Sequence, residues 1–228
     1  MNGFSRARTI ASGVLKLIVV ICAAAGTFLS AYAGRGTFMG GSRVFMFFTI
    51  QSNIAMALIS AAGFCLLLRD KAPGEVWYTV KLVGTVSITL TGVVFTVLLA
   101  PTLGDATWNV QNTLTHVVVP AAAVADFFVA APAAGMKQRS VVWVIVPPLL
   151  YVVYAGIGYV RGWEFVKGHN YPYFFLNWGG PAGAFGFVKE FPFMGCVWWI
   201  LVLLVFLIAV GWCYAAIADK LGRRRASQ

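Results

Sequence analysis

Two polar residues inside long apolar stretches have side chains that can do covalent chemistry together. Thr49 lies in "FFTIQSNIAMALIS" and His116 lies in "NTLTHVVVPAAAVAD". A threonine hydroxyl is a weak nucleophile until a base takes its proton, and a neutral imidazole at hydrogen-bond distance is such a base. The same residue types also have a structural role, because Thr and His side chains hydrogen-bond between membrane helices.

The polar residues around His116 recur at helical spacing. Asn109, Asn112, His116 and Pro120 follow i, i+3, i+7 and i+11, which places them on one stripe of a helix. Asp126 follows ten residues after His116, near the same face and roughly 15 Å farther along the axis. Ionisable residues in a lipid-embedded helix are costly and therefore candidates for function, although Asp126 is also placed to reach interfacial water.

A second polar stripe surrounds Thr49, and the two stripes are expected to meet. Ser52 and Asn53 follow Thr49 within one turn. Thr49 lies six residues after Arg43, and His116 lies eight residues after Trp108. At 1.5 Å per residue the two side chains sit roughly 9 and 12 Å below these markers. If both helices enter the membrane from the same side, the hydroxyl and the imidazole lie at one level.

Composition indicates which elements position these residues. The chain is 60% hydrophobic and 11% charged, and its mean hydropathy is +0.83, as in integral membrane proteins. About 20 apolar residues span a bilayer. We expect one all-α domain over residues 1–228, a bundle of six transmembrane helices. Its expected spans are 17–34, 44–68, 80–100, 108–131, 141–160 and 196–216.

The basic residues predict the orientation of this bundle. Cytoplasmic loops of membrane proteins carry an excess of Lys and Arg. With both termini in the cytoplasm, that side receives Arg6, Arg8, Lys16, Arg69, Lys71, Lys81, Lys137, Arg139, Lys220, Arg223, Arg224 and Arg225. The opposite side receives Arg35, Arg43, Arg161, Lys167 and Lys189. Twelve against five favours cytoplasmic termini and places Thr49 and His116 toward the outer leaflet.

Charge and composition also argue against several classes of partner. The net charge of +10 is scattered over loops, which disfavours nucleic-acid binding and favours contact with anionic membrane lipids. The chain has two histidines, too few for a three-histidine metal site or a bis-histidine haem that leaves His116 free. We expect no metal and no cofactor.

The stretch 161–195 is long enough to fold over one membrane face. It is rich in aromatic residues, glycine and proline, and aromatic rings settle at the membrane interface. One interpretation is an interfacial anchor. The other is a lid over the site, in which His169, Tyr171 or Tyr173 touches a substrate.

Three short motifs carry a family resemblance. "FFTIQSN", "THVVVP" and "GW…YPYFFLN" resemble motifs of the androgen-induced and androgen-dependent TFPI-regulating family of six-pass membrane threonine hydrolases, in particular its predicted bacterial branch. That resemblance implies a multi-pass protein of a bacterial plasma membrane that hydrolyses lipid esters of the fatty acid–hydroxy fatty acid type. It implies that Thr49 is the nucleophile and His116, followed by Pro120, the base. Asp126 matches an acidic residue that the family has at this position.

Such a site would form an acyl-enzyme that water from the outer face hydrolyses. Asn53 or Asn112 would donate a hydrogen bond to the oxyanion, and Ser52 would support the site. Asp126 lies too far along the helix to orient His116, so Asn112 or another helix must do so. The first alternative is a small-molecule or lipid transporter or binding protein that uses the same polar cavity without covalent chemistry. A purely structural membrane protein is the second alternative.

The orientation can be tested directly. We expect a reporter fused after Gln228 to behave as cytoplasmic, because twelve of the seventeen basic residues flank that side of the spans. A pair of fusions, one enzyme active only in the cytoplasm and one active only in the periplasm, measures this. Activity of the periplasmic reporter at Gln228 would invert the orientation and move the site to the inner leaflet.

Overall fold

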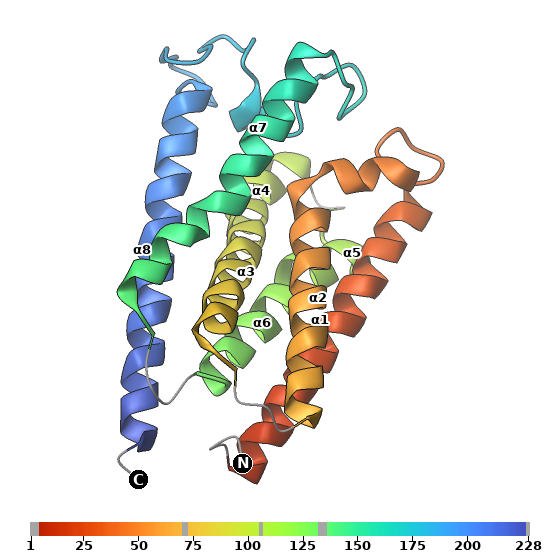
Figure 1. Cartoon of the computed structure of the whole chain (residues 1–228). Coiled ribbons are helices and arrows are strands. Elements are labelled where there is room, and N and C mark those ends of the chain that lie inside the picture. The colour runs from red at the N-terminus through yellow and green to blue at the C-terminus, as the bar shows by residue number, and fades with distance from the viewer. Residues whose placement is uncertain (1–4, 70–72, 105–106, 132–135, 227–228) are drawn as a thin grey trace.

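A computed structural model describes residues 5–69, 73–104, 107–131 and 136–226 as a helical bundle (Figure 1). Six helices are long and apolar enough to cross a membrane, as predicted. They are α1 (Arg6–Ala33), α2 (Phe48–Leu68), α3 with η2 and α4 (Glu75–Val93, Val94–Leu99 and Ala100–Leu103), α5 with η4 and α6 (Val110–Thr113, Leu114–Val118 and Val119–Val129), η5 with α7 (Gln138–Ile145 and Val146–Val160), and α8 (Cys196–Ala226). The described residues contain isolated β-bridges but no strand.

The two ends of the bundle differ in what they carry. α1 begins and α8 ends at the same end, which we call the terminal end (Figure 1). The segment 161–195, with the short helix η6 (Phe174–Leu176), covers the opposite end, which we call the loop end. The short helix η1 (Gly41–Met46) leads into α2 at the loop end. The chain enters α2 and α5 from this end, so Thr49 and His116 both lie near it.

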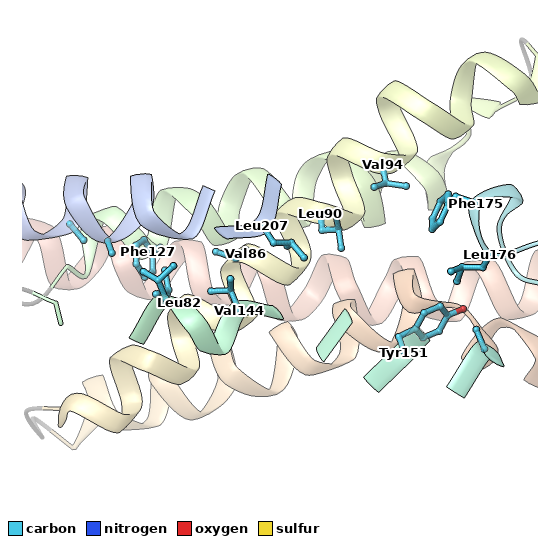
Figure 2. Close-up of a cluster of buried hydrophobic side chains, with 14 of the residues drawn as sticks. Leu82, Val86, Leu90, Val94, Phe127, Val144, Tyr151, Phe175, Leu176 and Leu207 are labelled. Atoms are coloured by element: carbon cyan, nitrogen blue, oxygen red, sulfur yellow. The ribbon is translucent and has the colours of Figure 1, made fainter. Parts of the chain in front are cut away.

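α3 is the centre of the bundle. In the most apolar stretch of the span that starts with α3, 61% of the residues are buried inside the bundle. The corresponding share for α8 is 17%. Figure 1 shows α3 between α8 and α2, with the fifth span crossing obliquely in front of it. One apolar core lies between α3, α6, α8 and the fifth span, and Figure 2 follows it from Leu82 and Phe127 to Val94 and Phe175. A smaller core, which includes Val19 and Met56, joins α1, α2, α3 and α6.

Two spans, α1 and the one that starts with α3, begin earlier at the terminal end than predicted. α1 extends back to Arg6 and α3 back to Glu75, so Lys16 and Lys81 lie inside the bundle with 3% of each residue exposed. Both lysines lie near the terminal end, with the other residues that the sequence assigns to the cytoplasmic side, but they are buried inside the bundle. Lys71, another of the twelve basic residues assigned to that side, lies outside the described residues.

Both lysines are buried because they meet Asp126. Lys16 Nζ lies 2.7 and 2.9 Å from the two carboxylate oxygens, and Lys81 Nζ lies 2.8 Å from Oδ2. Ser12 donates a further hydrogen bond of 2.6 Å to Oδ1. Lys81 also donates to the main-chain oxygen of Asp126 at 3.1 Å. We call Lys16, Asp126 and Lys81 the ion cluster; it connects α1, α6 and α3.

Two features of the fold make room for the ion cluster and balance its charge. The stem of Lys16 passes over Gly63 of α2, where a Cβ atom would come within 2.8 Å of it. Two ammonium groups around one carboxylate leave an excess of positive charge. The C-terminal end of α6 offsets this excess, because the last carbonyl groups of a helix carry partial negative charge. Arg8 also donates to one of these carbonyls, that of Val129, at 2.8 Å.

The ion cluster leads to a stability prediction. Asp126→Asn would leave two ammonium groups buried without a carboxylate, and breaking a buried ion pair in this way costs about 3–5 kcal/mol. Lys16→Met, in contrast, would leave one ammonium beside one carboxylate and should cost clearly less. Thermal unfolding of the purified variants in detergent measures both changes. Equal losses in the two variants would show that charge balance does not govern this cluster.

Candidate active site

The two residues singled out from the sequence meet at the loop end of the bundle. Thr49 stands in the first turn of α2, just after Phe47, whose extended backbone starts the helix. His116 stands in η4 of the fourth span. The Thr49 hydroxyl lies 3.3 Å from Nε2 of His116, which confirms the expected approach of the two side chains. His116 is 7% exposed, so little solvent reaches its imidazole.

The contacts of the second ring nitrogen, Nδ1, determine which nitrogen of His116 carries the proton. Nδ1 lies 3.0 Å from the main-chain oxygen of Asn112, which can only accept a hydrogen bond. The Thr115 hydroxyl lies 3.1 Å from Nδ1 and gives its own proton to the Gln111 carbonyl. Nδ1 therefore carries the hydrogen of a neutral ring, and Nε2 presents a lone pair to Thr49. As expected from the sequence, Asn112 orients the ring, and it does so through its backbone.

His116 sits in a local irregularity that its own sequence explains. Pro120 has no N–H group to donate to the carbonyl of His116, four residues earlier. The segment η4 is a π-helix, in which each turn is wider than in an α-helix. A second π-helix, η2, lies in the third span and brings Phe95 over His116, with ring centroids 3.6 Å apart and planes inclined by 15°. π-Helical turns are frequently found at functional sites.

α3 approaches the fourth span closely at one glycine. A Cβ atom on Gly92 would come within 2.8 Å of the His116 carbonyl oxygen and 3.2 Å of the Pro120 ring. A larger residue at this position would push α3 away from η4. The contact therefore needs glycine, and it holds Phe95 against the imidazole.

Asn53 holds the site together but does not supply an oxyanion donor. Its Nδ2 group donates to the carbonyl of Thr49 at 2.8 Å and to the carbonyl of Thr115 at 3.2 Å. Both N–H bonds are thus committed, and the side-chain oxygen that remains can only accept. The predicted oxyanion role of Asn53 is therefore wrong. Asn53 instead ties the backbone of the nucleophile candidate to the residue before His116.

Ser52 and the side chain of Asn112 also make structural contacts. Ser52 donates to the Thr49 carbonyl at 3.0 Å and pairs with the Thr91 hydroxyl of α3 at 2.7 Å. The Asn112 amide donates to the Thr107 carbonyl at 2.8 Å. These contacts agree with the supporting role expected for both residues.

Thr49 borders an apolar cavity of about 60 Å³. We call it the inner cavity. It lies between α2, α3, α7, α8 and the loop end, and six of the side chains around it appear in Figure 2. Its wall consists of Phe48, Thr49, Leu90, Thr91, Val94, Phe95, Leu99, Pro148, Leu149, Tyr151, Val152, Tyr173, Phe175, Leu176, Ile200, Leu203, Leu204 and Leu207. Protein interiors are otherwise close-packed, so an apolar space that borders a reactive pair is a candidate ligand site.

The segment 161–195 brings one of its three candidate residues to the site. Tyr173 lines the inner cavity, and its ring stacks on Phe175 with centroids 5.1 Å apart. Burial raises the pKa of the Tyr173 hydroxyl, and the proximity of Thr49, Tyr151 and Phe48 partly offsets this effect. The first N–H groups of a helix have no partner within the helix, so those of α2 are free to face this hydroxyl.

The remaining predicted residues lie elsewhere. His169 is exposed and packs against Tyr171, with ring centroids 5.1 Å apart, and neither residue lines the inner cavity. Asp126 belongs to the ion cluster, at the other end of its helix. The structure therefore supports neither a substrate contact for His169 and Tyr171 nor a place for Asp126 in the site.

Sequence reasoning missed residues of two kinds. Phe95 and Tyr151 are ordinary aromatic residues of apolar helices, and nothing in their spacing marks them. Lys16 did leave a signal, because it interrupts the apolar run "SGVLKLIVV" one turn after Ser12. An ionisable residue at such a position is expected to have a buried partner. Asp126 was a candidate for this buried partner of Lys16.

Comparison with known proteins adds nothing to this geometry. The chain matches no family model, and neither a curated protein nor a solved structure is significantly similar to it. The chemistry of the site must therefore be argued from its own residues.

Proposed function

We propose that this protein hydrolyses carboxylic esters of fatty acids, with Thr49 as the nucleophile and His116 as the base. The observation that carries this proposal is the 3.3 Å contact between the Thr49 hydroxyl and an Nε2 whose lone pair faces it. A hydroxyl paired with an oriented neutral imidazole is the arrangement that activates an alcohol for acyl transfer. The adjacent inner cavity is apolar, which suits an acyl chain.

The reaction proceeds in two balanced halves. Thr49 Oγ1 attacks the ester carbonyl carbon as its proton moves to Nε2 of His116. The tetrahedral adduct collapses, the proton passes from Nε2 to the leaving alkoxide, and the alcohol departs. Water then attacks the acyl-threonine while Nε2 takes one of its protons. Collapse of the second adduct releases the fatty acid and returns the proton to Thr49.

The orienting partner of His116 makes this pair a dyad. In a Ser-His-Asp triad a carboxylate orients the imidazole and stabilises the imidazolium that forms. Here the Asn112 carbonyl fulfils the first role, because it fixes the tautomer. A neutral carbonyl stabilises the imidazolium less than a carboxylate does, so we expect a slower enzyme than the triad hydrolases.

The oxyanion is stabilised at the N-terminal end of α2. The first main-chain N–H groups of α2 have no partner within the helix, and Thr49 and Tyr173 both line the inner cavity at this end of α2. Helix N-termini favour negative charge. Tyr173 supplies an O–H donor, whereas the Tyr151 hydroxyl is already donated to the Met46 carbonyl at 3.0 Å. A substrate carbonyl oxygen placed here would accept from these groups.

Two sequence observations support the proposal. Thr49, His116 and Pro120 are the residues on which the resemblance to six-pass threonine hydrolases rests, and all three lie at this site. The distribution of basic residues favours an orientation in which the loop end faces away from the cytoplasm. Substrates would then be membrane lipids or their ester derivatives in the outer leaflet, with water entering from outside.

The ion cluster favours a second candidate function, transport. Buried ionisable residues inside a membrane bundle commonly mark ion or proton pathways. A transporter would use the inner cavity and the ion cluster without covalent chemistry. Uptake of a lipid or small solute into proteoliposomes, with no covalent adduct at Thr49, would favour this function over hydrolysis.

Substitutions at the dyad test the hydrolase. Thr49→Ala should abolish ester turnover and labelling by a fluorophosphonate probe, while Thr49→Ser, which keeps the hydroxyl, should retain some of each. His116→Ala should lower turnover by about 10²–10⁴-fold, the contribution typical of a general base. The double variant should lose about as much as either single variant, because the two residues act as a unit. Substantial hydrolysis by folded Thr49→Ala protein would rule out the covalent mechanism.

Tyr173 provides a separate test of the oxyanion site. Tyr173→Phe removes the hydroxyl and keeps the ring, so kcat should fall by about 10²-fold, as for loss of one oxyanion donor. KM should change little, because the donor acts mainly in the transition state. Tyr171→Phe is the matched control, since Tyr171 does not line the inner cavity. Unchanged kcat in Tyr173→Phe would remove Tyr173 from the mechanism.

A further inference from the structure

The inner cavity has a closed end. Leu90 of α3 and Leu207 of α8 line it, and both are buried, with 7% and 0% of their surface exposed. Figure 2 shows these two leucines between Val86 on the terminal side and Val94 and Phe175 on the loop side. Val86 is fully buried and does not line the cavity. The cavity therefore stops where Leu90 and Leu207 meet the packed core.

The open length of the inner cavity follows from helix geometry. Along α3 and η2 its wall runs from Leu99 to Leu90, nine residues or roughly 13 Å of helix. Along α8 it runs from Ile200 to Leu207, seven residues or roughly 10 Å. Thr49 and Phe95, which stacks on His116, belong to the loop-side part of this wall. The wall below the nucleophile thus sets an upper limit on the length of a chain that could lie along it.

We propose that the inner cavity binds the acyl chain of the ester and that Leu90 and Leu207 form its floor, so that they limit the length of the chain. This inference rests on the proposed hydrolase function. The acyl carbon stays bonded to Thr49 Oγ1 between the two half-reactions, whereas the alcohol leaves after the first. The cavity that begins at Thr49 is consequently the site for the acid part of the ester. Its apolar wall selects one unbranched alkyl chain without a polar group near its end.

A second, more open groove provides the competing location. It lies on the other side of Phe48 and Tyr151, between α2, α3 and the fifth span. Gln51, Ser52 and Ser87 contribute polar groups to its wall, and Leu150, 65% exposed, lies at its edge. Thr49 does not line this groove. An alkyl chain bonded to Thr49 is therefore assigned to the inner cavity.

A chain-length series tests the assignment on the full-length protein in detergent or liposomes. The substrates are p-nitrophenyl butyrate, hexanoate, octanoate, decanoate, laurate and palmitate. Leu207→Ala should move the preferred ester toward longer chains, because the deleted methyl groups leave space at the floor. Leu207→Trp should lower kcat/KM for the longest accepted ester by about tenfold or more and spare butyrate, because overfilling the floor shortens the cavity. Leu90→Phe repeats the test from α3 if the α8 variants do not fold.

Two controls accompany these variants. Leu201→Ala changes an exposed position of α8 that does not line the inner cavity, and Leu150→Trp changes the edge of the second groove. Both should keep the wild-type length profile. A profile that shifts in Leu150→Trp and stays unchanged in the floor variants would overturn the assignment.

A binding measurement separates this inference from the proposed function. Displacement of a fluorescent fatty acid by unlabelled fatty acids of the same lengths should show the same cut-off, and Leu207→Trp should lower it. If this length-dependent binding occurs without ester hydrolysis, the cavity assignment stands and the hydrolase fails. If hydrolysis occurs with a profile that no floor variant shifts, the hydrolase stands and the assignment fails. Absence of both binding and hydrolysis for every chain length overturns both.

Discussion

The contact of Asp126 with Lys16 and Lys81 is the interaction on which the arrangement of the bundle depends. In lipid, apolar packing between helices gains little over packing against acyl chains, so shape and polar contacts decide which helices pair and in which register. Separating the members of the ion cluster is costly, because it would leave a buried charge unpaired. It connects α1, α6 and α3 at one level near the terminal end.

This connection has a consequence for the site at the other end. η4 and α6 belong to one continuous span, so the position of Asp126 also sets the depth of His116, ten residues earlier and roughly 15 Å away. The same cluster sets the depth of α3, which carries Phe95 and Gly92. The close approach at Gly92 and the stacking of Phe95 on the imidazole both require this register. α2 then joins the assembly through Asn53 and through the pairing of Ser52 with Thr91.

The buried charged groups and the pair of Thr49 and His116 lie toward opposite ends of the bundle. Among the described residues, buried ionic groups gather near the terminal end, whereas the dyad is surrounded by carbonyls, hydroxyls and rings. This separation suits an acyl-transfer site, because a buried carboxylate close to Thr49 would oppose the negative charge that develops on the substrate oxygen. It also explains why the imidazole is oriented by a backbone carbonyl. The carbonyl of Asn112, in α5 one turn before His116, accepts from Nδ1, so no additional charged residue is needed.

Hydropathy and spacing were enough to predict the six spans and the common level of Thr49 and His116. These features depend on the thickness of the apolar layer and on the rise per residue of a helix, both of which are local and regular.

The partners of each polar group could not be predicted in this way. Lys16 and Lys81 were counted with the loop charges, because a lysine lowers the hydropathy at the end of a predicted span. Hydropathy carries no information about a carboxylate on another helix. The sequence suggested Asn53 as an oxyanion donor. In the structure the carbonyls of Thr49 and Thr115, from two different spans, accept both of its N–H bonds. Tyr173, from a segment without periodicity, reaches Thr49 because the chain folds back over α2, a placement that depends on contacts distant in the sequence.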